Sequence, residues 1–231
     1  MDTDTGIGGA AGQFPSTDLS LLAAASGDLS NRPLGQIVAL YWKPVYRFIR
    51  LKFRKGNEDA KDLTQGFFSM ALQRDFFRGF DPRRATFRAY VRMAVDRFAA
   101  NQLAAQKRQK RGGDVEFEQL DENAASTESL EQAFEREWQR QLFTLAVDDL
   151  RAHCLAANKK LQLEIFEAYD LAGSERPSYA ELAARHGIAE TSVTNHLAWA
   201  RRMLRAFVTE RLRGVTSGEA ELRKELRRVW G

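Results

Sequence analysis

Apolar residues recur every three or four positions along most of this chain, and only five prolines interrupt it in 231 residues. The clearest run lies in residues 34–53 and consists of Ile37, Val38, Tyr41, Trp42, Val45, Phe48, Ile49 and Phe53. This spacing places side chains on one face of an α-helix, and abundant Ala, Leu, Arg and Glu also favour helices. The sequence therefore predicts an all-α fold, in which Pro44 starts a new helix or kinks this one.

Breaks in the helical pattern divide the chain into five segments. Residues 1–15 lack apolar periodicity and are expected to form a disordered tail. We expect a helical domain at 16–113, an acidic linker at 114–132, a second helical domain at 133–213 and a helical extension at 214–231. The linker is assigned because it is acidic and contains few large apolar residues.

Charge alternates along the chain in a way that the formal total of +4 conceals. Residues 1–40 carry −3, residues 41–113 carry +12, residues 114–150 carry −9 and residues 151–231 carry +4. Clustered cations suit a polyanionic partner, because they neutralise phosphates and release counterions. The pattern therefore favours two nucleic-acid-binding segments on either side of an acidic one.

Several function classes lack the residues that they require. Cys154 is the single cysteine, which excludes an intramolecular disulfide and a cysteine-rich zinc site. His153, His186 and His196 have no metal-ligand spacing with carboxylates, and no nucleophile elbow or phosphate loop is present. No apolar run reaches the roughly 18 residues of a membrane span, and no signal peptide is evident. We expect a cytoplasmic protein that is not an enzyme and needs no metal, cofactor or membrane.

Cations gather between residues 83 and 111, with Phe87, Tyr90 and Phe98 among them. Cations contact phosphates and aromatic faces stack on unpaired bases, so the segment suits opened nucleic acid. The same spacing also fits a solvated cationic face over a core that holds Phe87 and Phe98. The residues alone leave both interpretations open.

A helix-turn-helix pattern lies near the C-terminus. Ser178 and Glu181 form a capping box, and Gly187 supplies the turn between two closely packed helices. The second helix, from about residue 190, is expected to bury Val193, Leu197, Ala200 and Leu204. Its other face carries small and polar residues followed by arginines, which suits recognition of base edges in the major groove. The alternative is an ordinary helical hairpin with a solvated polar face.

Four segments together resemble bacterial sigma factors of the extracytoplasmic-function (ECF) group. Residues 59–68, Asp-Ala-Lys-Asp-Leu-Thr-Gln-Gly-Phe-Phe, are similar to the group's Asp-Ala-Glu-Asp-Leu-x-Gln-x-Phe signature. Tyr-Trp-Lys-Pro-Val-Tyr at 41–46 and Lys-Arg-Gly-Gly at 110–113 resemble one subgroup. Residues 179–202 are similar to the group's second domain. The resemblance covers about residues 17–231.

The resemblance implies a promoter-specificity subunit whose domains 16–113 and 133–213 correspond to sigma regions 2 and 4. Region 2 docks on the β′ clamp helices of core RNA polymerase, a role that carries over to Asp59, Asp62, Leu63, Gln65 and Phe68. Region 2 also opens the −10 promoter element, here through Phe80, Arg83, Arg84, Arg88, Tyr90, Arg92, Lys107, Arg108, Lys110 and Arg111. Region 4 contacts the β flap and reads the −35 element, here through Thr191, Ser192, Thr194, Asn195, His196, Arg201 and Arg202.

The chain departs from the family pattern at three positions, one of which lies in the docking signature. Lys61 stands where a Glu is usual, Tyr90 replaces a frequent Trp, and Asn101 replaces a common Asp. One hypothesis makes Thr64 a regulatory phosphosite, because phosphate would restore negative charge beside Lys61. An exposed, unmodified Thr is the simpler interpretation. Control by an anti-sigma factor or by a Ser/Thr kinase stays open at this point.

A second function is also compatible with the residues. The chain could be a stand-alone helix-turn-helix regulator in which residues 41–113 form a ligand-binding or dimerisation domain. Copurification with core polymerase separates this hypothesis from the sigma factor hypothesis.

Overall fold

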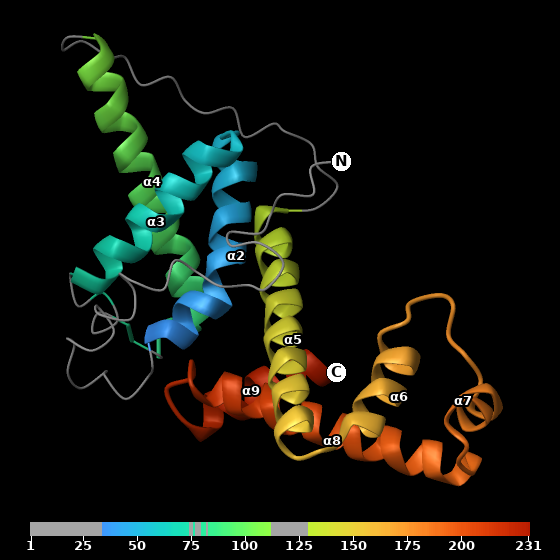
Figure 1. Ribbon diagram of the computed structural model, residues 1–231. Coiled ribbons are helices and arrows are strands. Elements are labelled where there is room, and N and C mark those ends of the chain that lie inside the picture. The colour runs from blue at the N-terminus through green and yellow to red at the C-terminus, as the bar shows by residue number, and fades with distance from the viewer. Residues whose placement is uncertain (1–33, 74–75, 77–79, 82, 112–128) are drawn as a thin grey trace. The chain divides into compact units, whose positions relative to one another are not determined.

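The computed structural model describes residues 34–73, 76, 80–81, 83–111 and 129–231 (Figure 1). Every regular element in these residues is a helix, which confirms the all-α prediction. The helices are α2 (Leu34–Phe53), α3 (Asn57–Gln73), α4 (Phe87–Arg111), α5 (Leu130–Ala156), α6 (Lys160–Asp170), α7 (Tyr179–His186), α8 (Glu190–Arg213) and α9 (Glu219–Trp230). The expected tail and most of the expected acidic linker lie outside the described residues.

The described residues form two compact units, one up to Trp138 and the other from Gln139 onward, and the division falls inside α5. In the first unit, α2 packs on both α3 and α4, and α3 packs on α4. Apolar faces of the three helices meet in a core that includes Val45, Ile49, Phe67, Val91 and Val95, each at most 2% exposed. The spacing of these residues along each helix is the spacing that predicted the helices.

α2 is continuous through Pro44, so the prediction that a new helix starts there is wrong, while a kink at Pro44 stays a prediction. Proline lacks the N–H that would bond to the fourth residue before it, but a helix held on one face by packing tolerates this loss. The helix ends at Phe53, and Arg54 adopts a left-handed conformation with φ of 49°. The next helix then begins at Asn57.

Aromatic rings fill the first unit's core. Tyr41 packs edge-on against Phe87 with ring centroids 5.6 Å apart, and Trp42 stacks on Phe68 at 5.7 Å. Phe87 is 2% exposed, so the core interpretation holds for that ring. Phe98 is half-buried and packs against Phe67.

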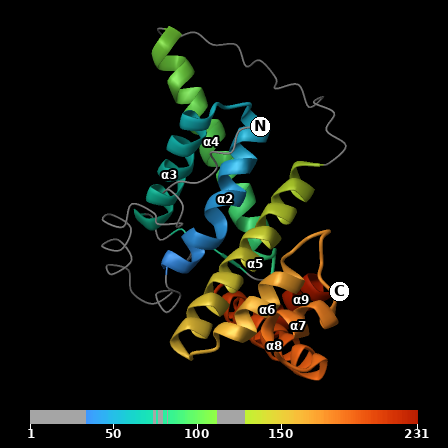
Figure 2. The same ribbon diagram turned by 45° about the vertical axis from the view of Figure 1, so that its right-hand side comes forward.

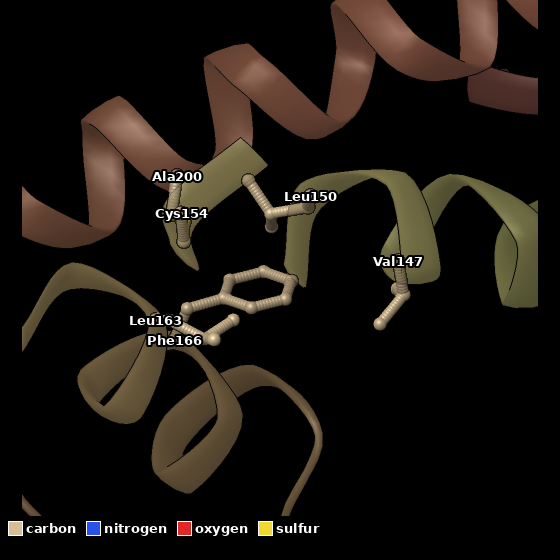
Figure 3. Close-up of a cluster of buried hydrophobic side chains, with 6 residues drawn as sticks. All are labelled: Val147, Leu150, Cys154, Leu163, Phe166 and Ala200. Atoms are coloured by element: carbon tan, nitrogen blue, oxygen red, sulfur yellow. The ribbon is translucent and has the colours of Figure 1, made fainter. Parts of the chain in front are cut away.

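The second unit has two apolar clusters. In the first, Phe166 of α6 points toward Leu150 and Cys154 of α5 and toward Ala200 of α8 (Figure 3). In the second, Ile165 of α6 meets apolar residues of α7 and α8, namely Leu182, Ala183, Val193 and Leu197. α6 therefore contributes neighbouring residues to both clusters and holds α7 and α8 in place.

Candidate polymerase and DNA interfaces

The exposed face of α3 carries the docking signature. Asp59, Asp62 and Gln65 are exposed at successive three-residue steps, which keeps them near one another on the helix surface. Leu63 is 7% exposed and Phe68 is 2% exposed. The structure therefore brings the three polar residues to the surface, whereas Leu63 packs beneath them and Phe68 belongs to the core against Trp42.

A groove of about 440 Å³ runs between α3 and α4. Asp59, Asp62 and Leu63 line its α3 side together with Ser69, Met70 and Gln73. Phe98, Gln102, Leu103 and Gln106 line its α4 side. The sequence did not predict that these α4 residues lie beside the signature, because they are distant from it along the chain and only packing brings them there.

Gly66 allows the two helices to approach at this groove. A Cβ placed on Gly66 would lie 3.3 Å from Cζ of Phe98, which is closer than ordinary van der Waals contact. A glycine in mid-helix normally costs about 1 kcal/mol relative to Ala, so the close approach compensates for a poor helix former. The position was not singled out from the sequence, although a glycine inside a helical pattern is a signal of close packing.

Thr64 is completely buried, so the expectation that it lies on the surface is wrong. Its Oγ1 donates a hydrogen bond to the carbonyl of Ala60 at 2.7 Å. A phosphoryl group of two negative charges cannot enter this apolar position without opening the helix packing. The folded chain therefore gives no support to a phosphosite at Thr64. The neighbouring Lys61 is 22% exposed and pairs with Glu58 at 3.1 Å.

The predicted −10 residues are divided between the two ends of α4. Arg83 and Arg84 lie in the turn before the helix and are 88% exposed, while Lys107 and Arg108 are exposed near its far end. A helix rises about 1.5 Å per residue, so Arg88 and Lys107 are roughly 29 Å apart along the axis. In both views the C-terminal part of α4 extends past α2 and α3 (Figures 1 and 2). The side chains of Lys110 and Arg111 lie outside the described residues.

Asp81 organises the turn before α4. Its carboxylate accepts hydrogen bonds from the backbone N–H and the guanidinium of Arg83, each at 3.0 Å, and Arg84 lies 3.6 Å away. These contacts with Arg83 hold the pKa of Asp81 below its ordinary value. The turn thus presents two exposed arginines around one ionised carboxylate.

Tyr90 is fixed by an aromatic cluster at the start of α4. Its ring stacks on Phe76 with centroids 4.7 Å apart and lies 5.5 Å from that of Phe80, and its hydroxyl donates to the carbonyl of Phe76 at 2.8 Å. Burial raises the pKa of Tyr90. The ring also lines a second groove of about 400 Å³ that includes Asn101. Of the −10 set, Phe80 and Tyr90 are thus brought together, half-buried.

Arg88 and Arg92 are engaged by α5. The Arg88 side chain is 3% exposed and its Nε donates to Glu135 at 2.6 Å. Arg92, 27% exposed, donates to Glu131 at 3.1 Å. Neither guanidinium is presented openly to solvent in this structure.

The helix-turn-helix has the local geometry that its sequence predicts. The hydroxyl of Ser178 accepts from the N–H of Glu181, and the Glu181 carboxylate accepts from the N–H of Ser178. Gly187 has φ of 62° and ψ of 38°, the left-handed conformation that glycine adopts without strain. Val193, Leu197 and Ala200 are at most 1% exposed, while Leu204 is partly buried.

The N-terminal half of α8 presents its polar face. Thr191, Thr194, Asn195 and Arg202 are exposed, and Ser192 and His196 are half-buried. Arg201 differs from these residues, because its guanidinium makes two hydrogen bonds of 2.8 Å to Asp170 of α6. The contacts with Asp170 raise the pKa of Arg201, and the pair ties α8 to α6.

The described residues contain no helix that is long and apolar enough to cross a membrane, and no cluster of metal-ligating side chains. Searches of curated proteins and of solved structures gave no match. The family model for ECF sigma factors matches residues 21–213, which include both units' helices except α9. This family consists of non-catalytic transcription initiation factors, which work with core RNA polymerase and promoter DNA. The chain therefore belongs to the ECF sigma factor family and is an alternative sigma factor that binds core RNA polymerase and directs promoter recognition and transcription initiation.

Proposed function

We propose that the two compact units divide the work of this sigma factor. The first unit docks on core polymerase through α3 and opens the −10 element with α4 and the turn before it. The second unit contacts the β flap and reads the −35 element with α8. The observation that carries this division is the exposed polar face at the start of each of these two helices, α3 and α8.

The docking site consists of the α3 face and the groove beside it. Asp59 and Asp62 supply negative charge, and Gln65 supplies amide donors and acceptors at the surface. The groove has the length of several helical turns and accepts side chains of a partner helix such as those of the β′ clamp. Leu63 and Phe68 support this surface from below. An anti-sigma protein that blocks core binding would cover the same groove.

The −10 site begins at the turn before α4. Arg83 and Arg84 contact backbone phosphates, and the aromatic cluster of Phe80 and Tyr90 offers a ring face beside them. Lys107 and Arg108 contact phosphate at a separate point, because the length of α4 lies between them. Arg88 and Arg92 join the site when their carboxylate partners leave.

The −35 site is the N-terminal half of α8. Asn195 and the exposed threonines reach base edges, and Arg202 contacts phosphate or guanine. Arg201 acts through Asp170 by holding the helix against α6. The mild charge of this unit predicts weak binding to DNA in the absence of polymerase.

Core binding tests the docking site. Asp62→Arg with Gln65→Ala reverses one charge at the surface, and we expect core affinity to fall by about 2–4 kcal/mol, roughly 30- to 1,000-fold. The matched control is Glu164→Arg with Gln162→Ala on α6, which makes the same changes in the second unit. Run-off transcription on genomic fragments should stop with the first pair and persist with the second. Equal core affinities for both pairs would show that the docking face is elsewhere.

Protection of promoter DNA tests the −35 site. Asn195→Ala and Arg202→Ala should each weaken holoenzyme protection of the upstream element by about 1–3 kcal/mol and relax its sequence preference. Arg223→Ala on α9 is the control, because that arginine is exposed and pairs with Glu219. If the control weakens protection as much, α8 is not the reading helix.

A further inference from the structure

Residues 129–138 comprise Ser129 and the first turns of α5; they belong to the first compact unit and contact α2 and α4. Glu135 pairs with Arg88 at 2.6 Å and Glu131 pairs with Arg92 at 3.1 Å. The residue numbers rise along α5 as they fall along α4, so the two pairs form consecutive rungs of an antiparallel ladder. Carboxylates on one helix thus match guanidiniums on the other, one turn apart.

Aromatic contacts fix this segment in register. Phe134 meets Phe48 of α2 edge-on with ring centroids 6.0 Å apart. The Arg88 guanidinium lies over the ring of Trp138, 4.0 Å from its centroid. Arg88 is therefore enclosed by a carboxylate on one side and an aromatic ring on the other, in an environment that a phosphate and a base could supply instead.

The ladder also balances repulsion within each helix. Glu131 and Glu135 stand four residues apart, as do Arg88 and Arg92, and like charges at this spacing destabilise an isolated helix. Each of the two helices is therefore stabilised when its pair of like charges faces opposite charges on another segment or molecule. The exposed fractions of Arg92 and Glu131, 27% and 61%, leave the outer rung accessible to a competing anion.

We propose that residues 129–138 act as an intramolecular acidic ligand that occupies Arg88 and Arg92 until the phosphate backbone of opened promoter DNA displaces it. This inference rests on the proposed −10 role of the two arginines. It adds a competitor for them from within the chain. Binding of DNA by the free protein is then limited by release of the α5 segment rather than by the number of cations.

The test compares full-length variants that lose two negative charges at different places. Glu131→Gln with Glu135→Gln removes the ladder's carboxylates, and Glu210→Gln with Glu219→Gln removes two from exposed pairs on α8 and α9. The probe is a fluorescein-labelled single-stranded oligo-dT of about 20 nucleotides, titrated at several salt concentrations. Freeing two cations should steepen the salt slope by about 1.4, which gives at most about 25-fold tighter binding at 0.1 M salt. The control pair should gain less than about twofold because it frees no cation of this site.

Equal gains for the two pairs would overturn the inference, because net charge would then explain both. Adding Arg92→Gln to the variant with Glu131→Gln and Glu135→Gln should cancel about half of the increase in salt slope. If the full increase persists in this triple variant, the inference is also overturned. If removal of both carboxylates impairs folding, Glu131→Gln alone changes only the exposed rung and should steepen the slope by about 0.7. No steepening in that variant contradicts the inference.

Hydrogen exchange gives a readout that does not depend on affinity. Saturating oligo-dT should increase amide exchange in a peptide covering 130–138, and unchanged exchange in a saturated complex would contradict displacement. Failure of the −10 proposal gives a different result. If Arg92→Gln changes neither oligo-dT binding nor open-complex formation by the holoenzyme, the arginine has no role in −10 opening, whatever the segment does.

Discussion

The groove beside α3 and the reading face of α8 are built in different ways. The reading face belongs to one helix, and its position is set by a capping box and a turn glycine that directly precede that helix in the sequence. The groove has walls from α3 and α4, which are separated in sequence and meet through Gly66 and Phe98. A local motif is therefore readable from the sequence, whereas a surface formed by two distant helices is not.

The largest effect is expected from a core residue that supports the reading face. Phe166→Ala empties a position that is 1% exposed between α5, α6 and α8. We expect the free energy of unfolding to fall by about 3–5 kcal/mol, the usual cost of such a cavity. Urea unfolding followed by far-UV circular dichroism measures it. A loss below 1 kcal/mol would mean that α7 and α8 hold their arrangement without α6.

Gly66→Leu tests whether close helix approach makes the groove. The new side chain collides with Phe98, so we expect about 1–3 kcal/mol of destabilisation from overpacking. Core affinity should fall at the same time, because the side chain fills the space between α3 and α4. Gly66→Ala is the graded control, since its gain of about 1 kcal/mol in helix propensity opposes the tighter contact. Unchanged core affinity with Leu at this position would separate the groove from docking.

Ser178→Ala tests the local part of the comparison. Loss of the cap should cost about 1 kcal/mol of unfolding free energy. Hydrogen bonds from Ser178 lower the pKa of Glu181 below its ordinary 4.5, so the stability that they give is present above that pH and is lost as pH falls through the lowered folded value. Alanine keeps the backbone N–H bond to the Glu181 carboxylate, which is the larger cause, and removes only the bond from the hydroxyl. The variant should therefore show a partly reduced loss of stability in this acidic range, which thermal melts between about pH 2.5 and 6 would detect. An unchanged acid profile would show that the Ser178 hydroxyl does not bond to the Glu181 carboxylate in solution.

The smallest effect concerns Arg201 and Asp170. Their side chains are 48% and 20% exposed, so solvent screens the pair and we expect a coupling of about 0.5–1 kcal/mol in a double-mutant cycle of Arg201→Ala and Asp170→Ala. The cycle is measured by urea unfolding. A coupling near zero, together with loss of −35 protection in Arg201→Ala alone, would indicate that Arg201 contacts DNA and does not hold α8 against α6.

Sequence reasoning performed best where the structure is local. The apolar spacing predicted the helices, and Ser178, Glu181 and Gly187 predicted both ends of α7. It failed at Thr64, which was expected on the surface and which packing places inside. The docking role of Phe68 stays a prediction, and its ring lies in the core against Trp42. The predicted start of a new helix at Pro44 was also wrong, because the packed face of α2 tolerates one missing hydrogen bond. The sequence did not predict that Phe98 and Gln102 line the groove beside α3, since no pattern within α4 indicates which helix packs against it.

The sequence by itself determined that the chain is helical, where its recognition helix starts, and which family it belongs to, because these depend on periodicity, caps and motifs over a few turns. Only the tertiary structure decided which charged residues face solvent. The sequence predicts that Arg88 and Arg92 contact DNA, yet in the structure they form ion pairs with Glu135 and Glu131 of α5. These ion pairs form because the fold brings α4 and α5 together. The paired residues are more than 35 positions apart in the sequence, so no local pattern predicts that they meet.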